Sequence, residues 1–124
     1  MALCQKTFDA SVAGLLAQGR YSMDSGGDSC AYRGVGHVKC AAGHLISDEE
    51  YNRNLEGLSV DDQDVRGAVI ASGFCPDTAS ALQEIHDTFA KSKRFDFHPG
   101  PWPEFIGALK AFAAANKLSW NQPA

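Results

Sequence analysis

The chain has 124 residues, and its 15 aspartates and glutamates outnumber 11 lysines and arginines, giving a formal net charge of −4. This length predicts a single globular domain, residues 1–124, in which an apolar fraction of 44% can form a hydrophobic core. The acidic balance argues against direct nucleic-acid binding, which normally requires a basic stripe.

Hydrophobic periodicity predicts a chain that is roughly half helical. Residues 3–18 carry apolar side chains at i, i+4, i+7 and i+8, the spacing of one helix face, and Gly19 is the expected stop. A short helix is expected to begin at Ser47, because Ser47 and Glu50 match the S-x-x-E pattern of a capping box. Five helices are predicted in all, at about residues 3–18, 47–54, 59–72, 78–92 and 103–116.

The last of these helices should supply much of the core. It has the strongest apolar stripe in the chain, and we expect four of its side chains to be buried: Trp102, Ile106, Leu109 and Phe112. Ile70 is expected on the apolar side of the third helix, together with Val65 and Val69. The tail from Trp120 to Ala124 is expected to be loose.

Between the first two helices, residues 30–40 predict a β-hairpin. Arg33 is expected to pair with His37 across the loop 34–36, because three-residue hairpin loops need a positive φ that glycine supplies. In this register Cys30 faces Cys40, and one face is apolar while the other is cationic. Two strands alone are marginally stable in water. The predicted fold is therefore α+β and mainly helical, with about five helices packed on one two-stranded antiparallel hairpin.

Cysteine and histidine side chains are concentrated in this region, which raises the possibility of a zinc site. Cys30, His37, Cys40 and His44 lie within fifteen residues. Structural zinc sites usually have more closely spaced cysteines, and the expected register puts His37 on the opposite face. We therefore expect no metal and no cofactor, with Cys30 and Cys40 as reduced, buried thiols. A small zinc-stabilised module remains an alternative.

A thiol enzyme is the second alternative. Cys40 with His44 or His86, and with Asp87 next to His86, supplies the residue types of a catalytic triad. Adjacent residues on a helix point about 100° apart, so Asp87 is not expected to orient His86. No local catalytic signature accompanies these residues, and we expect no catalytic residue.

The segment 48–64 is strongly acidic, with seven carboxylates and one arginine, a local charge of −6. Acidic residues in the first turn of a helix complement the helix dipole, which explains six of the seven. If two such helix starts lie side by side, they also form an anionic surface that attracts a basic partner. The candidate partner-binding residues are Asp48, Glu49, Glu56, Asp61, Asp62 and Asp64.

An extended motif joins the expected hairpin to the helix after it: Tyr32-Arg33-Gly34, then residues 39–46, Asp48-Glu49, Tyr51 and Glu56-Gly57. This motif resembles that of a group of small uncharacterised bacteriophage and prophage proteins, C-x-Y-R-G…K-C-A-x-G-x-L-I-P-D-E-x-Y, with Ser47 in place of the usual proline. Residues 82–87 are also similar, and the resemblance covers about residues 20–90. It implies a phage-associated setting and carries no assigned activity. Small acidic phage proteins often bind a host protein, including host defence complexes.

Composition favours a cytoplasmic location in the bacterial host. No apolar run approaches the ~20 residues of a membrane span, and the N-terminus does not have the pattern of a secretory signal. Four scattered cysteines do not suggest a disulfide framework. The sequence therefore predicts a non-catalytic protein that modulates or inhibits a host protein with a basic surface, without direct contact with nucleic acid or membrane.

Overall fold

The computed structural model describes residues 3–22, 31–34, 36–90 and 102–122. Within these ranges it contains four α-helices and two short 3-10 helices: α1 (Gln5–Gln18), η1 (Gly43–Leu45), η2 (Arg53–Leu55), α2 (Gln63–Ala71), α3 (Pro76–Ala90) and α4 (Trp102–Ala115). None of the described residues belongs to a strand or a sheet. The predicted α+β class is therefore wrong, and the fold is all-helical.

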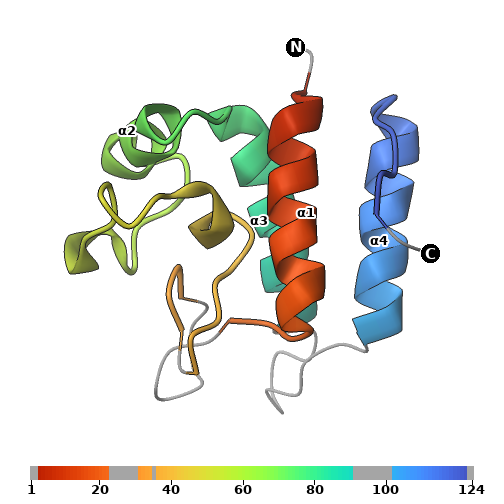
Figure 1. The fold of residues 1–124 in the computed structure, drawn as a ribbon, viewed down its shortest axis with the longest axis horizontal. Helices are drawn as coiled ribbons and strands as arrows, with labels where there is room; N and C mark the ends of the chain where they lie inside the picture. The colour runs from red at the N-terminus through yellow and green to blue at the C-terminus, as the bar shows by residue number, and fades with distance from the viewer. Residues whose placement is uncertain (1–2, 23–30, 35, 91–101, 123–124) are drawn as a thin grey trace.

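Helices α1 and α3 form the centre of the molecule. The first contacts α3 and η1, and the second contacts α2 and α4. In Figure 1, α1 stands between α4 on one side and the loop-rich segment 31–60 on the other. Two clusters of buried side chains result, one under α4 around Phe8, Leu82 and Phe105, and the other under the loop-rich segment around Leu45 and Val69. Across the described part of the chain, no helix combines the length and apolarity needed to cross a membrane.

The helix boundaries follow local signals. Helix α1 ends at Gly19, which has φ +74° and donates its N–H to the Leu15 carbonyl, so the predicted stop is confirmed. Helix α2 begins later than expected, at Gln63, because Asp62 is its N-cap and accepts the N–H of Asp64. Helix α3 begins at Pro76, a residue well suited to a first helical turn.

The predicted hairpin is reduced to one isolated antiparallel bridge, between Arg33 and Lys39. The predicted pairing of Arg33 with His37 is wrong, and His37 lies exposed with a φ of +62°. The Gly34 N–H donates to the Val38 carbonyl, so Arg33 and Lys39 form a non-hydrogen-bonded pair, and the next step of a ladder would need the N–H of Tyr32, which a distant side chain occupies. Glu56 accepts the N–H groups of Tyr32 and Arg33, and the Gln18 side chain accepts the N–H of Lys39. Strand pairing therefore stops after a single bridge.

The predicted helix at Ser47 is also absent. Glu50 and Tyr51 donate to the Ser47 carbonyl, which makes one turn, and the chain then enters η2. A capping box needs the Glu50 side chain to accept the Ser47 N–H. In the structure the Ser72 hydroxyl accepts that N–H instead, at 2.9 Å, so the helix is not capped and does not form.

The apolar stripe of α4 is rotated from the one expected. Phe105, Leu109 and Ala113 are buried, whereas three of the four predicted core residues are only half-buried: Trp102, Ile106 and Phe112. Leu109 is confirmed as a core residue. Ile70 on α2, expected on the apolar side, is 59% exposed.

The described part of the C-terminal tail is fixed to α1, which corrects the expectation of a loose tail. Gln5 exchanges two hydrogen bonds with the backbone of Ser119, and Asn121 donates to Asp9. The Trp120 ring also packs edge-on against Phe8, with the ring centroids 6.2 Å apart.

A disulfide joins Cys4 to Cys75, with their Cα atoms 6.4 Å apart, so the expectation of a chain without disulfides is wrong. Two reciprocal hydrogen bonds flank it. The Thr78 hydroxyl accepts the N–H of Cys4, and the Thr7 hydroxyl accepts the N–H of Cys75. Cys40 is buried, as expected, while Cys30 lies outside the described residues, so the predicted state of that pair stays a prediction.

Two glycines provide a matched test of the packing around η1. A methyl group at Gly43 would overlap the backbone carbonyl oxygen of Tyr32, whereas one at Gly67 in α2 meets no atom of the described chain within 4 Å. Gly43→Ala should therefore lower the free energy of unfolding by about 1–3 kcal/mol in a urea titration. Gly67→Ala should instead raise it by about 0.5–1 kcal/mol, because alanine favours the helix. Equal effects from the two substitutions would contradict this close approach.

Candidate functional site

Two of the six predicted partner-binding residues hold the chain around the Arg33–Lys39 bridge. Asp48 forms an ion pair with Arg33 at 2.7 Å, although its own side chain is 86% exposed. Glu56 accepts the backbone N–H groups of Tyr32 and Arg33 and the hydroxyl of Tyr51. Burial and this last hydrogen bond raise the pKa of Tyr51 to about 12, so the hydroxyl stays a donor. The Glu56 carboxylate thus supports the fold.

The other four candidates divide between helix capping, a pocket and the open surface. Asp62 caps α2, and Asp61 accepts a hydrogen bond from Ser80 at 3.1 Å. Glu49 is exposed at the turn that follows Ser47, and exposed Asp64 lines a second, smaller pocket together with Glu50. The six carboxylates therefore do not act as one patch, and only Asp61 lines the larger pocket.

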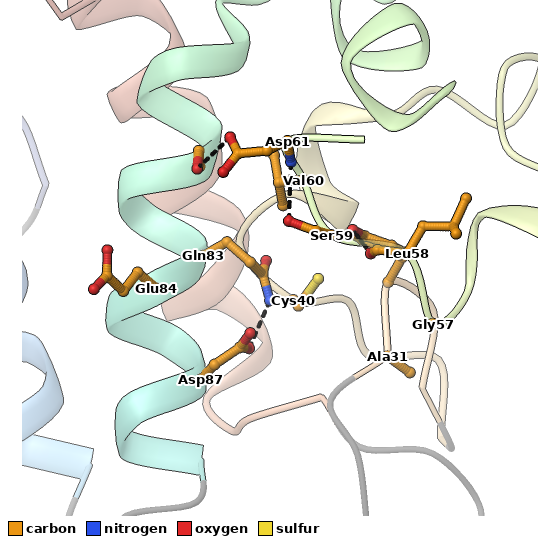
Figure 2. A pocket seen from close by; sticks show the side chains of 12 residues that line it. Ala31, Cys40, Gly57, Leu58, Ser59, Val60, Asp61, Gln83, Glu84 and Asp87 are labelled. Atoms are coloured by element: carbon orange, nitrogen blue, oxygen red, sulfur yellow. Dashed lines mark hydrogen bonds between the residues drawn. The ribbon is translucent and has the colours of Figure 1, made fainter. Parts of the chain in front are cut away.

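That larger pocket has a volume of about 520 Å³, within the range of roughly 300–1,000 Å³ usual for ligand sites. It lies between α3 and the loop 57–61, as Figure 2 shows. Buried side chains form its floor: Tyr32, Cys40 and Val60. Three carboxylates line it, with Asp61 and Asp87 on its walls and Glu84 at its rim, and none of the described residues that line it is a lysine or an arginine.

The pocket carboxylates differ in how firmly they are held. Gln83 and His86 both donate to Oδ1 of Asp87, at 2.6 and 3.0 Å, and these two hydrogen bonds hold the carboxylate in place. Gln83 is itself fixed, because its carbonyl oxygen accepts the N–H of Ala42. In Figure 2, Gln83 and Asp87 lie on the pocket side of α3, while Glu84 projects from the other side and lies at the rim.

The Tyr32 hydroxyl on the floor of the pocket adds no charge to it. The Tyr32 hydroxyl donates to the carbonyl of Leu58. Burial, followed by the charges of Cys40 and Asp87, raises the pKa of Tyr32 above its ordinary value. Tyr32 therefore stays a neutral phenol, and the charge of the pocket comes from its carboxylates.

Contrary to the sequence-based expectation, Asp87 does contact His86, through Nδ1 of the ring. The Nε2 atom accepts the backbone N–H of Ser22 at 3.1 Å, so the ring carries its proton on Nδ1. Both ring nitrogens are therefore used inside the protein, and the side chain is fully buried. This arrangement positions Asp87 and leaves His86 without a nitrogen that could act on a substrate.

His44 and Cys40 do not form a catalytic pair in this arrangement. The His44 ring bonds Gln18 on α1 at 2.9 Å, and burial, with Lys39 and His86, lowers its pKa to about 4. The Cys40 sulfur accepts the N–H of Gly43 and lines the pocket on the other side. In the described ranges, no three His, Cys, Asp or Glu side chains are grouped so that they could hold a metal ion.

Sequence reasoning missed the pocket residues of α3. Ser80, Gln83, Glu84 and Asp87 recur at i, i+3, i+4 and i+7, which is the polar counterpart of the apolar stripe that predicts this helix. The spacing groups them along one side of the helix, with Glu84 at the edge of that side, but it does not show that the loop 57–61 lies against it.

Comparison with known proteins provides no assignment for this site. No family model matches the chain, and no match was found among the curated proteins or among the solved structures.

Proposed function

We propose that this is a small, non-catalytic binding protein, encoded by a phage or prophage, that modulates or inhibits a host protein with a basic surface. The observation that carries the proposal is the pocket beside α3, which is lined by three carboxylates, two on its walls and one at its rim, and by no basic residue among its described lining. An anionic pocket with an apolar floor suits the long apolar stem and charged head of a lysine or arginine side chain. The resemblance to phage proteins supports the setting, and a host defence complex is the class of target that it suggests.

The electrostatics of the molecule favour the same kind of partner. The net charge is −4, and seven carboxylates fall within residues 48–64. Asp61 belongs both to this segment and to the pocket, so the acidic segment continues onto the pocket wall. Complementary charge of this kind mainly accelerates association and makes binding sensitive to salt.

The proposal includes a cytoplasmic location in the bacterial host. The Cys4–Cys75 disulfide bears on this location, because the cytoplasm is a reducing compartment. Reducing compartments keep most cysteines as thiols. The proposal therefore requires that the protein stay folded when Cys4 and Cys75 are reduced. The two threonine hydrogen bonds that flank the disulfide support this requirement, because they join the same ends of α1 and α3 without it.

The proposal predicts a specific loss of binding when the pocket is neutralised. The triple variant Asp61→Asn, Glu84→Gln, Asp87→Asn should weaken capture of basic proteins from host lysate by at least about tenfold, mainly through slower association. Capture by the native protein should likewise fall when salt is raised from low ionic strength to about 0.5 M. The amount captured and the association rate, measured by surface plasmon resonance with the captured protein, check this expectation.

A matched variant removes the same charge elsewhere. Glu49→Gln, Glu50→Gln, Asp64→Asn changes three exposed carboxylates outside the pocket and should leave the captured proteins bound. Replacing Asp62 would be a poorer control, since it caps α2. If binding survives both 0.5 M salt and the pocket variant, the pocket is not the docking site. If only the second triple abolishes binding, the docking surface is the acidic segment.

A further inference from the structure

The pocket has two anionic ends. Asp61 is held beside Ser80 by a hydrogen bond of 3.1 Å, and Asp87 is held by Gln83 and His86. Figure 2 shows Asp61 toward one end of the pocket and Asp87 toward the other, with Gln83 and Cys40 between them. The two carboxylates are therefore separate sites and not one cluster.

The helix sets the distance between these ends. Ser80, which holds Asp61, and Asp87 are seven residues apart on α3. At 1.5 Å per residue, these two positions lie roughly 10 Å apart along the helix axis. One compact cation cannot reach both carboxylates over that distance. A ligand with two positive charges joined by an apolar chain can, and the chain would then lie over the buried floor formed by Tyr32, Cys40 and Val60.

The two ends also differ in rigidity. Asp61 is 72% exposed. It accepts a hydrogen bond from Ser80 and lies 4.0 Å from the Arg66 guanidinium, the longest distance that still counts as an ion pair. Asp87 is 45% exposed, and two buried side chains of the described chain, Gln83 and His86, donate to its Oδ1 atom. The Asp87 carboxylate is therefore held in place before a ligand arrives, which reduces the entropy lost on binding. Asp87 is thus the anchor, and Asp61 is the outer contact.

From this geometry we infer that the pocket binds an elongated dication, with one cationic group at Asp87 and the second at Asp61. The inference rests on the proposed function, because the source of the dication is then two basic side chains of the partner protein, about 10 Å apart at their charged heads. A free aliphatic polyamine offers the same chemistry, so the experiment must separate the two sources.

Calorimetric titration of the full chain with three amines tests the spacing. The probes are 1,7-diaminoheptane, 1,3-diaminopropane and heptylamine, which differ in length and charge. The seven-carbon diamine should bind about tenfold more tightly than either of the others, because only it can place a charge at each end. Equal affinity for the diamine and heptylamine would overturn the inference, since the second carboxylate would then contribute nothing.

Single substitutions locate the two charges. Asp61→Asn and Asp87→Asn should each abolish the preference for the long diamine over heptylamine, while Asp64→Asn, outside the pocket, should preserve it. Asp61→Asn is the decisive variant, because its exposed side chain can change without disturbing the core, whereas Asp87 also bonds His86. A preference that persists in Asp61→Asn would overturn the inference.

A peptide with blocked ends separates the two sources of the dication. Acetyl-Lys-Ala-Ala-Lys-amide, whose only charges are its two ammonium groups, should bind with the same dependence on Asp61 and Asp87. If the diamines and spermidine bind but the peptide does not, the assignment of the dication to a protein partner is overturned. If heptylamine matches the diamine while the pocket triple variant still loses its captured protein, the two-ended inference fails and the proposed function stands.

Discussion

Leu109→Ala is expected to lower the free energy of unfolding by roughly 2–5 kcal/mol, the usual range for truncating a fully buried leucine. Leu109 is completely buried and lies in the cluster that joins α4 to Phe8 of α1 and Leu82 of α3. Deleting its side chain removes apolar contacts and leaves a cavity among ring systems that cannot easily move to fill it. Urea titration followed by circular dichroism measures the change.

An exposed isoleucine supplies the comparison. Ile70→Ala removes a side chain of the same size from α2, where it is 59% exposed, and should change the free energy of unfolding by less than about 1 kcal/mol. A shift below 0.5 kcal/mol for Leu109→Ala as well would mean that α4 is peripheral to the stable fold.

The sequence predicts the helices well where the signals are local. The end of α1 at Gly19 and the core position of Leu109 each depend on residues within one or two turns. Hydrophobic periodicity predicts less exactly which face of a helix is turned toward the core. Helix α4 carries apolar residues on most of its sides, and the buried ones are Phe105, Leu109 and Ala113.

The predicted hairpin failed because distant side chains changed the pairing. Its turn glycines and alternating faces were consistent with two strands, but Glu56 and Gln18 occupy the N–H groups on either side of the bridge. A carboxylate more than twenty positions away in the sequence leaves no periodic signal. The failed capping box at Ser47 has the same cause, since Ser72 is the competing acceptor.

The candidate site was predicted only in part, for a related reason. The sequence predicts an acidic surface that includes Asp61. It does not predict the pocket, which exists because the loop 57–61 folds against α3. The expectation that Asp87 does not orient His86 is wrong, because the rule on adjacent helical residues describes only where side chains leave the helix. It does not limit which side-chain atoms can meet, and Nδ1 of the buried His86 ring lies 3.0 Å from Oδ1 of Asp87.

Removing the Cys4–Cys75 disulfide is the second change with a large expected effect. The bond joins residues 71 positions apart, so it excludes many extended conformations of the unfolded chain. The double variant Cys4→Ser, Cys75→Ser should lose roughly 2–4 kcal/mol of unfolding free energy in urea under non-reducing conditions. The native protein in excess dithiothreitol should shift by a similar amount, because reduction produces the same unlinked chain.

The reciprocal hydrogen bonds should keep the unlinked protein folded at low denaturant. Thr7 and Thr78 continue to hold the N–H groups of Cys75 and Cys4 whether or not the sulfur atoms are joined. Adding Thr78→Val to the double serine variant should therefore destabilise it further by about 1 kcal/mol, because the partly buried N–H of Cys4 loses its acceptor. The helical circular dichroism of the double serine variant, measured without urea, should match that of the native protein. Loss of that signal would show that α1 and α3 need the disulfide to associate, and it would rule out a reducing cytoplasm as the place where this protein acts.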